Sequence, residues 1–170
     1  MHYSKTPITV FRRDREQWIN AGGGNIRVNP DGEFELTKLA RCEHVIVVSG
    51  WPDEAPGVVR FDASDPYPEI EVRTAVAEPT RFHLIGKPPA GKDLRTYFRI
   101  FSADELPLES LDGDRDLREC KTDDASVPLV NGRYMLLVER DGYRERRIDF
   151  DVPAGDTIVV PLDPEKSQSK

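Results

Sequence analysis

Polar and apolar residues alternate with a period of two along most of this chain, which is the spacing of a β-strand that buries one face. In residues 25–29, Ile26 and Val28 are expected to point to one side and their neighbours to the other. Residues 30–32, Pro-Asp-Gly, then form a turn in which proline presets φ and glycine accepts a positive φ. Alternation resumes at residues 33–36, so the segment predicts a β-hairpin.

Other short apolar segments are separated by prolines and glycines and are not joined into long helical periods. Prolines at positions 52, 56, 66 and 68 suit sandwich loops and edge strands. Residues 12–18 and 103–106 each fit only one short helical turn, since neither has a long amphipathic period. The prediction is an all-β fold with further strands at residues 44–49, 58–61, 70–72, 81–85, 97–101, 127–129, 134–138, 147–152 and 157–162.

The second half of the chain repeats the order of features in the first half. Each half has an apolar strand, a Gly-aromatic corner, an Arg-apolar-Asp step and a closing apolar strand. These are residues 44–48, 50–51, 60–62 and 70–72 in the first half, and residues 134–138, 142–143, 147–149 and 158–162 in the second. The repeat predicts two tandem small antiparallel β-sandwiches over residues 1–76 and 77–164, joined at residues 77–80, with a frayed tail at residues 165–170.

Residues 131–134, Asn-Gly-Arg-Tyr, lead to Gly142-Tyr143 and then to Asp-Val-Pro-Ala-Gly at residues 151–155. Together with residues 159–162, this series resembles the carboxypeptidase regulatory-like domain, and residues 29–39 with the strand from His44 look similar. The resemblance implies a transthyretin-like (prealbumin-like) sandwich of the immunoglobulin-like kind. The first copy would lack its opening strand, because only residues 7–11 are available for it. It also implies a non-catalytic module that is often attached to surface or secreted proteins, which favours an extracytoplasmic location.

The net charge of the 170 residues is −7, from 31 acidic and 24 basic side chains. An acidic chain repels phosphate backbones unless a local basic stripe overrides the mean, and Arg144, Arg146 and Arg147 are flanked by acids. Nucleic acid is therefore not an expected partner. The first residues lack the apolar core of a signal peptide, and no apolar run has the length of a membrane helix, so membrane insertion is not expected. The compartment stays open.

The chain has none of the motifs that accompany common catalytic chemistry. It has no Gly-x-Ser-x-Gly elbow, and residues 22–24, Gly-Gly-Gly, precede a predicted strand and do not open a helix that could bind phosphate. The pair Cys42 and His44 could take zinc with His83 and Cys120, but the spacing is not that of zinc modules. We therefore predict no enzyme activity and no cofactor.

Two sets of residues are weak candidates for binding a ligand. Asp112, Asp114 and Asp116 place carboxylates at alternate positions, as calcium loops do, although Leu117 stands where such a loop needs glycine, so a solvated acidic loop is favoured. Trp18, Trp51 and Tyr67 could form an aromatic platform for sugar rings, although packing into a small sandwich core is the favoured interpretation.

The sequence therefore predicts a non-catalytic interaction or structural module with a protein partner. Exposed sheet edges suggest that the partner attaches by adding a strand. Two alternatives stay open. One is a carbohydrate-binding module that uses the three aromatic residues, and the other is an accessory domain of a larger enzyme or surface protein.

Overall fold

The structure of the chain is a computed structural model that describes residues 8–22, 26, 28–29, 31–49, 54–64, 69–86, 96–108, 123–153 and 157–165. Within these residues every regular element is a β-strand, which confirms the predicted all-β class. In chain order the strands are β1 (Ile8–Asp14), β2 (Gln17–Gly22), β3 (Glu43–Val48), β4 (Glu54–Ala55), β5 (Gly57–Asp62), β6 (Ala75–Val76), β7 (Pro79–Ile85), β8 (Thr96–Ser102), β9 (Asp124–Pro128), β10 (Gly132–Arg140), β11 (Arg146–Val152) and β12 (Ile158–Pro161).

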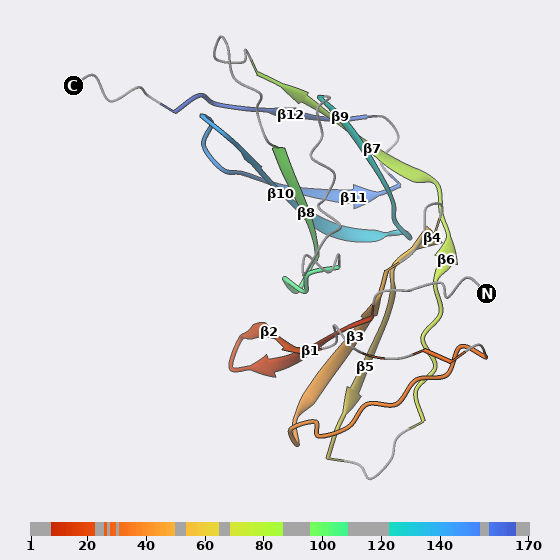
Figure 1. The fold of residues 1–170 in the computed structure, drawn as a ribbon. Helices are drawn as coiled ribbons and strands as arrows, with labels where there is room; N and C mark the ends of the chain where they lie inside the picture. The colour runs from red at the N-terminus through yellow and green to blue at the C-terminus, as the bar shows by residue number, and fades with distance from the viewer. Residues whose placement is uncertain are drawn as a thin grey trace.

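The first half contains one four-stranded antiparallel sheet in the order β2-β1-β3-β5, which forms the lower body in Figure 1. Strand β1 is an inner strand of this sheet, and it includes residues 8–11 of the segment that was considered for an opening strand. The helical turn expected at residues 12–18 was wrong, because that segment is the β1–β2 hairpin. Its tight turn contains Arg15 with φ of 57°, a conformation for which an arginine gives no sequence signal.

The predicted hairpin at residues 25–36 is present only as its turn. Gly32 has φ of 86°, and the backbone N–H of Asn29 donates to the carbonyl of Glu33 at 2.9 Å. The described residues on either side belong to no strand, and neither do residues 70–72, where a strand was expected. The alternation instead serves packing, because partly buried side chains from these segments cover one face of the four-stranded sheet: Ile26, Val28, Phe34, Leu36, Ile70 and Val72.

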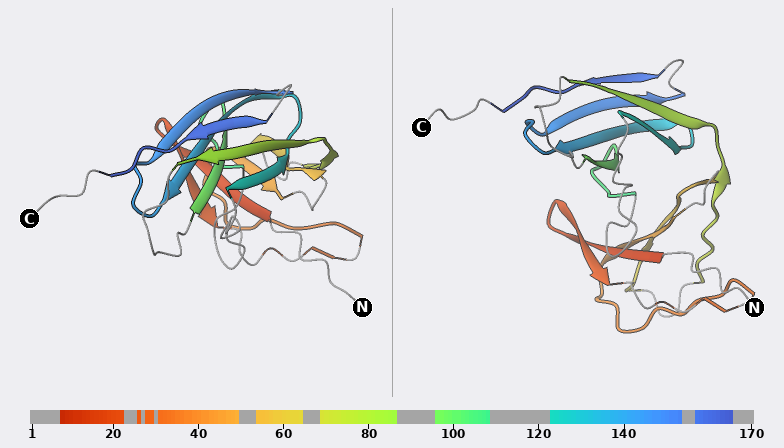
Figure 2. Two further views of the ribbon diagram at one scale, coloured as in Figure 1. Left: turned by 90° about the horizontal axis from the view of Figure 1, so that it is seen from above. Right: turned by 45° about the horizontal axis from the view of Figure 1, so that its top comes forward.

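The second half contains two three-stranded sheets, in the orders β11-β10-β8 and β12-β7-β9, seen as the upper body in Figure 1 and in the right view of Figure 2. Strand β12 runs parallel to β7, and the other pairs are antiparallel. Alternate side chains of β7 and β8 are buried, as the pattern predicts for facing sheets, whereas β10 buries the consecutive residues Leu136, Leu137 and Val138. The rings of Phe82 and Phe150 meet edge to face across the two sheets, with their centroids 5.3 Å apart.

The two faces of the four-stranded sheet belong to different hydrophobic clusters. Ile8, Val10 and Ile46 lie on the face covered by residues 26–39 and 70–72. Phe11, Val45 and Val47 lie on the other face and belong to the buried cluster that fills the second half. The two halves are therefore joined by a shared core as well as by the chain.

Candidate functional site

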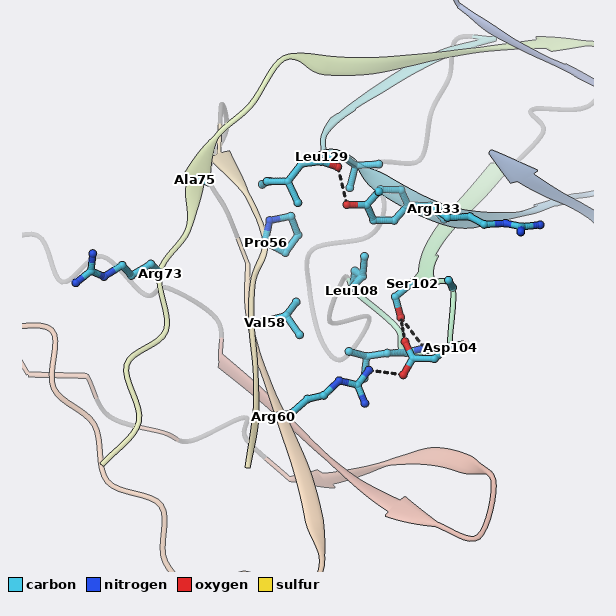
Figure 3. A pocket seen from close by; sticks show the side chains of 16 residues that line it. Pro56, Val58, Arg60, Arg73, Ala75, Ser102, Asp104, Leu108, Leu129 and Arg133 are labelled. Carbon is cyan, nitrogen blue, oxygen red and sulfur yellow. Dashed lines mark hydrogen bonds and ion pairs between the residues drawn. The ribbon is translucent and has the colours of Figure 1, made fainter. Parts of the chain in front are cut away.

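A cleft of about 470 Å³ lies between the two halves, beside the part of the sheet that the shared core does not cover. One wall is formed by the β4–β5 segment, with Ala75 alongside (Figure 3). The other wall comes from residues 102–108, which follow β8, and from residues 129–134, which link β9 to β10. The cleft therefore depends on both halves being held in one arrangement.

The position of the cleft follows from the strand register of the sheet. Val58 lies opposite Val47, and Arg60 lies opposite Val45, so all four side chains share the face that packs on the second half. Val47 and Val45 are buried there, whereas Val58 on the edge strand β5 is 40% exposed. The second half therefore covers the sheet face at Val45 and Val47 but leaves the apolar Val58 on the edge strand β5 partly uncovered. The cleft lies at this uncovered edge.

The floor of the cleft is apolar. Pro56, Val58, Leu108 and Leu129 point into it (Figure 3), and Leu106 also lines it. Among the described residues, five large apolar side chains are exposed, and two of them, Val58 and Val130, line this cleft. Exposed apolar side chains gathered in a concave surface are typical of a binding site.

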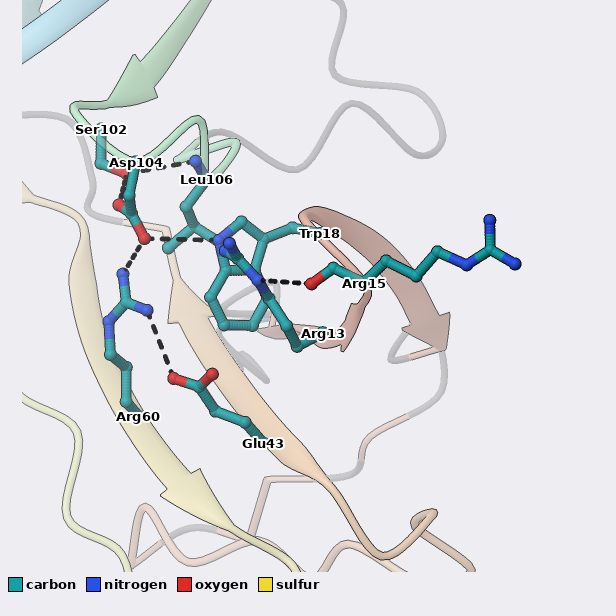
Figure 4. A network of polar contacts seen from close by, with 8 residues as sticks. All are labelled: Arg13, Arg15, Trp18, Glu43, Arg60, Ser102, Asp104 and Leu106. Carbon is teal, nitrogen blue, oxygen red and sulfur yellow. Dashed lines mark hydrogen bonds and ion pairs between the residues drawn. The ribbon is translucent and has the colours of Figure 1, made fainter.

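Strands β1, β2, β3 and β5 each contribute a residue to a polar cluster at one end of the cleft, and Asp104 of the second half lies at its centre (Figure 4). The side chain of Asp104 accepts hydrogen bonds from Ser102 at 2.6 Å, from the indole N–H of Trp18 at 3.3 Å and from Arg60. Arg60 also lies 3.5 Å from Glu43. The contact between Trp18 and Asp104 spans 86 positions of the chain, and the contact between Arg60 and Asp104 spans 44. Both contacts therefore join the first half to the second.

Two arginine side chains pack against the ring of Trp18. The guanidinium carbons of Arg13 and Arg60 each lie 5.0 Å from the ring centroid, which is the geometry of a cation–π contact. Trp18 was a weak candidate for a sugar-binding platform, with packing as the favoured interpretation. In the structure its N–H donates to Asp104 of the second half, and its ring packs against Arg13 and Arg60 of the first half. The other two members, Trp51 and Tyr67, lie outside the described residues.

The environment of Asp104 favours its ionised form. Partial burial by itself raises the pKa of a carboxyl group, but the hydrogen bonds from Ser102 and Arg60, the charge of Arg60 and the indole of Trp18 together hold the pKa of Asp104 below its ordinary value of 3.8. The folded protein therefore binds a proton at this site less readily than the unfolded chain. The stabilisation is fully present above pH 3.8 and is lost as the pH falls through the lower value of the folded state.

Replacing Asp104 by Asn is expected to lower the free energy of unfolding by about 1 kcal/mol at neutral pH, a modest value because the carboxylate is partly exposed. The difference from the wild type should shrink below about pH 4, where the wild-type carboxyl becomes protonated. Urea denaturation at a series of pH values measures both effects. Asp149→Asn is the control, because Asp149 lies 3.7 Å from Arg133 and both side chains are 67% exposed. A constant difference down to pH 2 would contradict this role of Asp104.

The serine in this cluster is not arranged as a nucleophile. Ser102 donates its hydroxyl proton to Asp104 and accepts from the backbone N–H of Leu106 at 3.2 Å. The two described histidines are engaged elsewhere, His44 with the carbonyl of Cys42 at 2.8 Å and His83 with Asp124 at 2.8 Å. Activation of a serine requires a suitably strong base within hydrogen-bond distance, and neither histidine occupies that position. The carboxylate of Asp104 does, but its lowered pKa makes it a weak base.

The candidate metal ligands lie partly within the described residues. In the part of the chain that the structure describes, no group of three or more His, Cys, Asp or Glu side chains is placed to hold a metal ion. Asp112, Asp114 and Asp116 lie outside the described residues, as does Cys120. The Cys42 thiol is free, and it lies 4.0 Å from Nδ1 of the buried His44. His44 stacks on Phe61 with ring centroids 5.5 Å apart, which favours the interpretation of a packed strand histidine.

Comparison of the chain with protein-family models, with curated protein sequences and with solved structures found no match. The resemblance to the carboxypeptidase regulatory-like domain therefore stays a prediction. The described residues also include no helix long and apolar enough to cross a membrane.

Proposed function

We propose that this chain is a non-catalytic protein-interaction module whose binding surface is the cleft between its halves. The observation that carries this proposal is the exposure of Val58 and Val130 in a concave surface with an apolar floor. Exposing apolar side chains to water costs free energy, and a partner that covers them recovers it. The polar groups nearby support binding over chemistry, because Ser102 and Arg60 are each bound to Asp104.

Strand β5 adds a second means of attachment. It is the edge of the four-stranded sheet, and Val58 projects from it into the cleft. An edge strand can pair with an extended segment of another chain through its backbone, while the side-chain pocket supplies selectivity. The predicted mode of attachment by strand addition is therefore proposed for β5 in particular.

Replacing Val58 by Asp is expected to reduce partner binding by about tenfold or more, because it places a charge on the apolar floor that a partner would desolvate. The purified chain serves as bait in an extract of the organism that encodes it, and recovered proteins are quantified by mass spectrometry. Val159→Asp is the matched control, since Val159 is 51% exposed on β12 and does not line the cleft. Equal recovery of every specific partner by wild type and Val58→Asp would refute the cleft as the binding surface.

A further inference from the structure

We propose that the second half binds a small tetrahedral oxyanion, such as phosphate or sulfate, at one end of its β11-β10-β8 sheet. In the part of the chain that the structure describes, four buried side-chain atoms have no hydrogen-bond partner. Three of them lie at this end of the sheet: Nε of Arg140, Nε of Arg146 and the hydroxyl oxygen of Thr96. Nearly all buried polar groups in proteins are hydrogen-bonded, so three unpaired groups in one place point to a bound ion that pairs with them.

The strand register places these three groups on one face of the sheet. Arg140 of β10 lies opposite Thr96 of β8, and Arg146 of β11 lies opposite Val138, which is two residues before Arg140. Opposed residues, and residues two apart along a strand, point to the same face. This is the inner face of the sheet, because Val138 is fully buried in the core of the second half. The three groups therefore lie at the end of the space between the two sheets.

The site carries an excess of positive charge. The side chain of Arg140 is only 10% exposed, donates a hydrogen bond to Asp123 at 2.8 Å and lies over the ring of Tyr143. Arg146 forms an ion pair with none of the described carboxylates, and its Nε is buried. Two guanidinium groups thus share one carboxylate, although the whole chain carries a net charge of −7. A partly buried cation is costly without a counter-ion, so the site favours an anion.

The donors suit a tetrahedral oxyanion better than a carboxylate. Arg140 and Arg146 each keep an unpaired Nε–H, and Thr96 adds a hydroxyl donor from a third strand. Phosphate and sulfate present acceptor oxygens in several directions, whereas the two oxygens of a carboxylate lie in one plane. The ion can approach from the end of the sandwich, where Asp123 is 51% exposed although it is bound to Arg140.

The test uses inorganic phosphate and sulfate as probes, each compared with sodium chloride at equal ionic strength. Both anions are expected to raise the melting temperature of the full chain saturably, by about 3–6 °C at ~10 times the Kd. Titration calorimetry gives the Kd itself. Arg146→Gln should raise the Kd for phosphate about tenfold or more, and Thr96→Val, which removes the hydroxyl and keeps the shape, about threefold.

Arg147→Gln is the matched control for Arg146→Gln. Arg147 is the next residue on β11, so its side chain points to the opposite face, where it is 63% exposed, and the change in net charge is the same. Arg140 is left unchanged in the test, because its substitution would also remove the contacts with Asp123 and Tyr143.

Weaker phosphate binding by Arg146→Gln and Thr96→Val, with Arg147→Gln equal to the wild type, would establish the oxyanion site. Equal responses of all four proteins would reflect only the general effect of these salts on protein stability and would overturn it. Acetate that binds as tightly as phosphate would overturn the assignment to a tetrahedral ion. Absence of binding by either anion would mean that water satisfies the three groups, and the inference would be overturned as well.

Discussion

Phe11→Ala is expected to lower the free energy of unfolding by about 3–5 kcal/mol, because it removes a buried aromatic side chain and leaves a cavity. Phe11 belongs to the first half by position, yet it is only 6% exposed within the cluster that fills the second half. Loss of its side chain should therefore weaken both halves. Urea denaturation measures the loss, and hydrogen exchange should rise in β8 and β10 as well as in β1 and β3.

Phe34→Ala is the matched control for this substitution. Phe34 is partly buried against the opposite face of the sheet, in the cluster that includes Ile46. Its removal should cost less and should leave exchange in β8 and β10 unchanged. A loss of less than about 1 kcal/mol for Phe11→Ala, or unchanged exchange in the second half, would show that the halves do not share a core.

Gly57→Ala is expected to destabilise the chain by about 1–3 kcal/mol, because the added methyl group has no room. A Cβ atom at position 57 would lie 2.6 Å from the carbonyl oxygen of Arg73 and 2.9 Å from its carbonyl carbon. Both are backbone atoms, so the obstacle cannot move aside by a change of rotamer. The segment that contains Arg73 also forms part of the cleft wall, so the substitution should weaken partner binding together with stability.

Gly132→Ala is the matched control for position 57. A Cβ atom there would be 3.4 Å from the nearest atoms, which belong to the ring of Tyr134, and this is close to ordinary contact. Thermal denaturation should show a shift for Gly57→Ala several times that for Gly132→Ala. Equal shifts would indicate that the contact between Gly57 and Arg73 is looser than the structure gives it.

Much of the second half could be predicted from the sequence, because its strands bury alternate side chains. The period of two in residues 134–138 places Tyr134, Leu136 and Val138 on one face, and all three are buried in β10. The first half was harder to predict from the sequence, because alternation of apolar and polar residues occurs there in two different kinds of structure. In β5 it marks a strand, whereas at Phe34 and Leu36 it marks irregular chain that packs its apolar side chains on a sheet.

The β1–β2 hairpin was missed because its turn carries no recognisable chemistry. Arg15 adopts the left-handed conformation that glycine or asparagine usually signals. Because no turn could be recognised at Arg15, residues 12–18 were not predicted as a hairpin. Trp18 was therefore not predicted to contact Arg13. In the structure these two residues are direct cross-strand partners, which brings the guanidinium group to the indole ring.

The sequence by itself determined the all-β class and the approximate positions of most strands, because side-chain alternation is a local property of extended chain. Only the tertiary structure decided that β1 is an inner strand, that one face of the sheet joins the core of the second half, and that a cleft remains at β5. It also brought Trp18 and Arg60 to Asp104. Contacts between residues so distant in sequence depend on strand order and on the packing of the two halves, which no local pattern encodes.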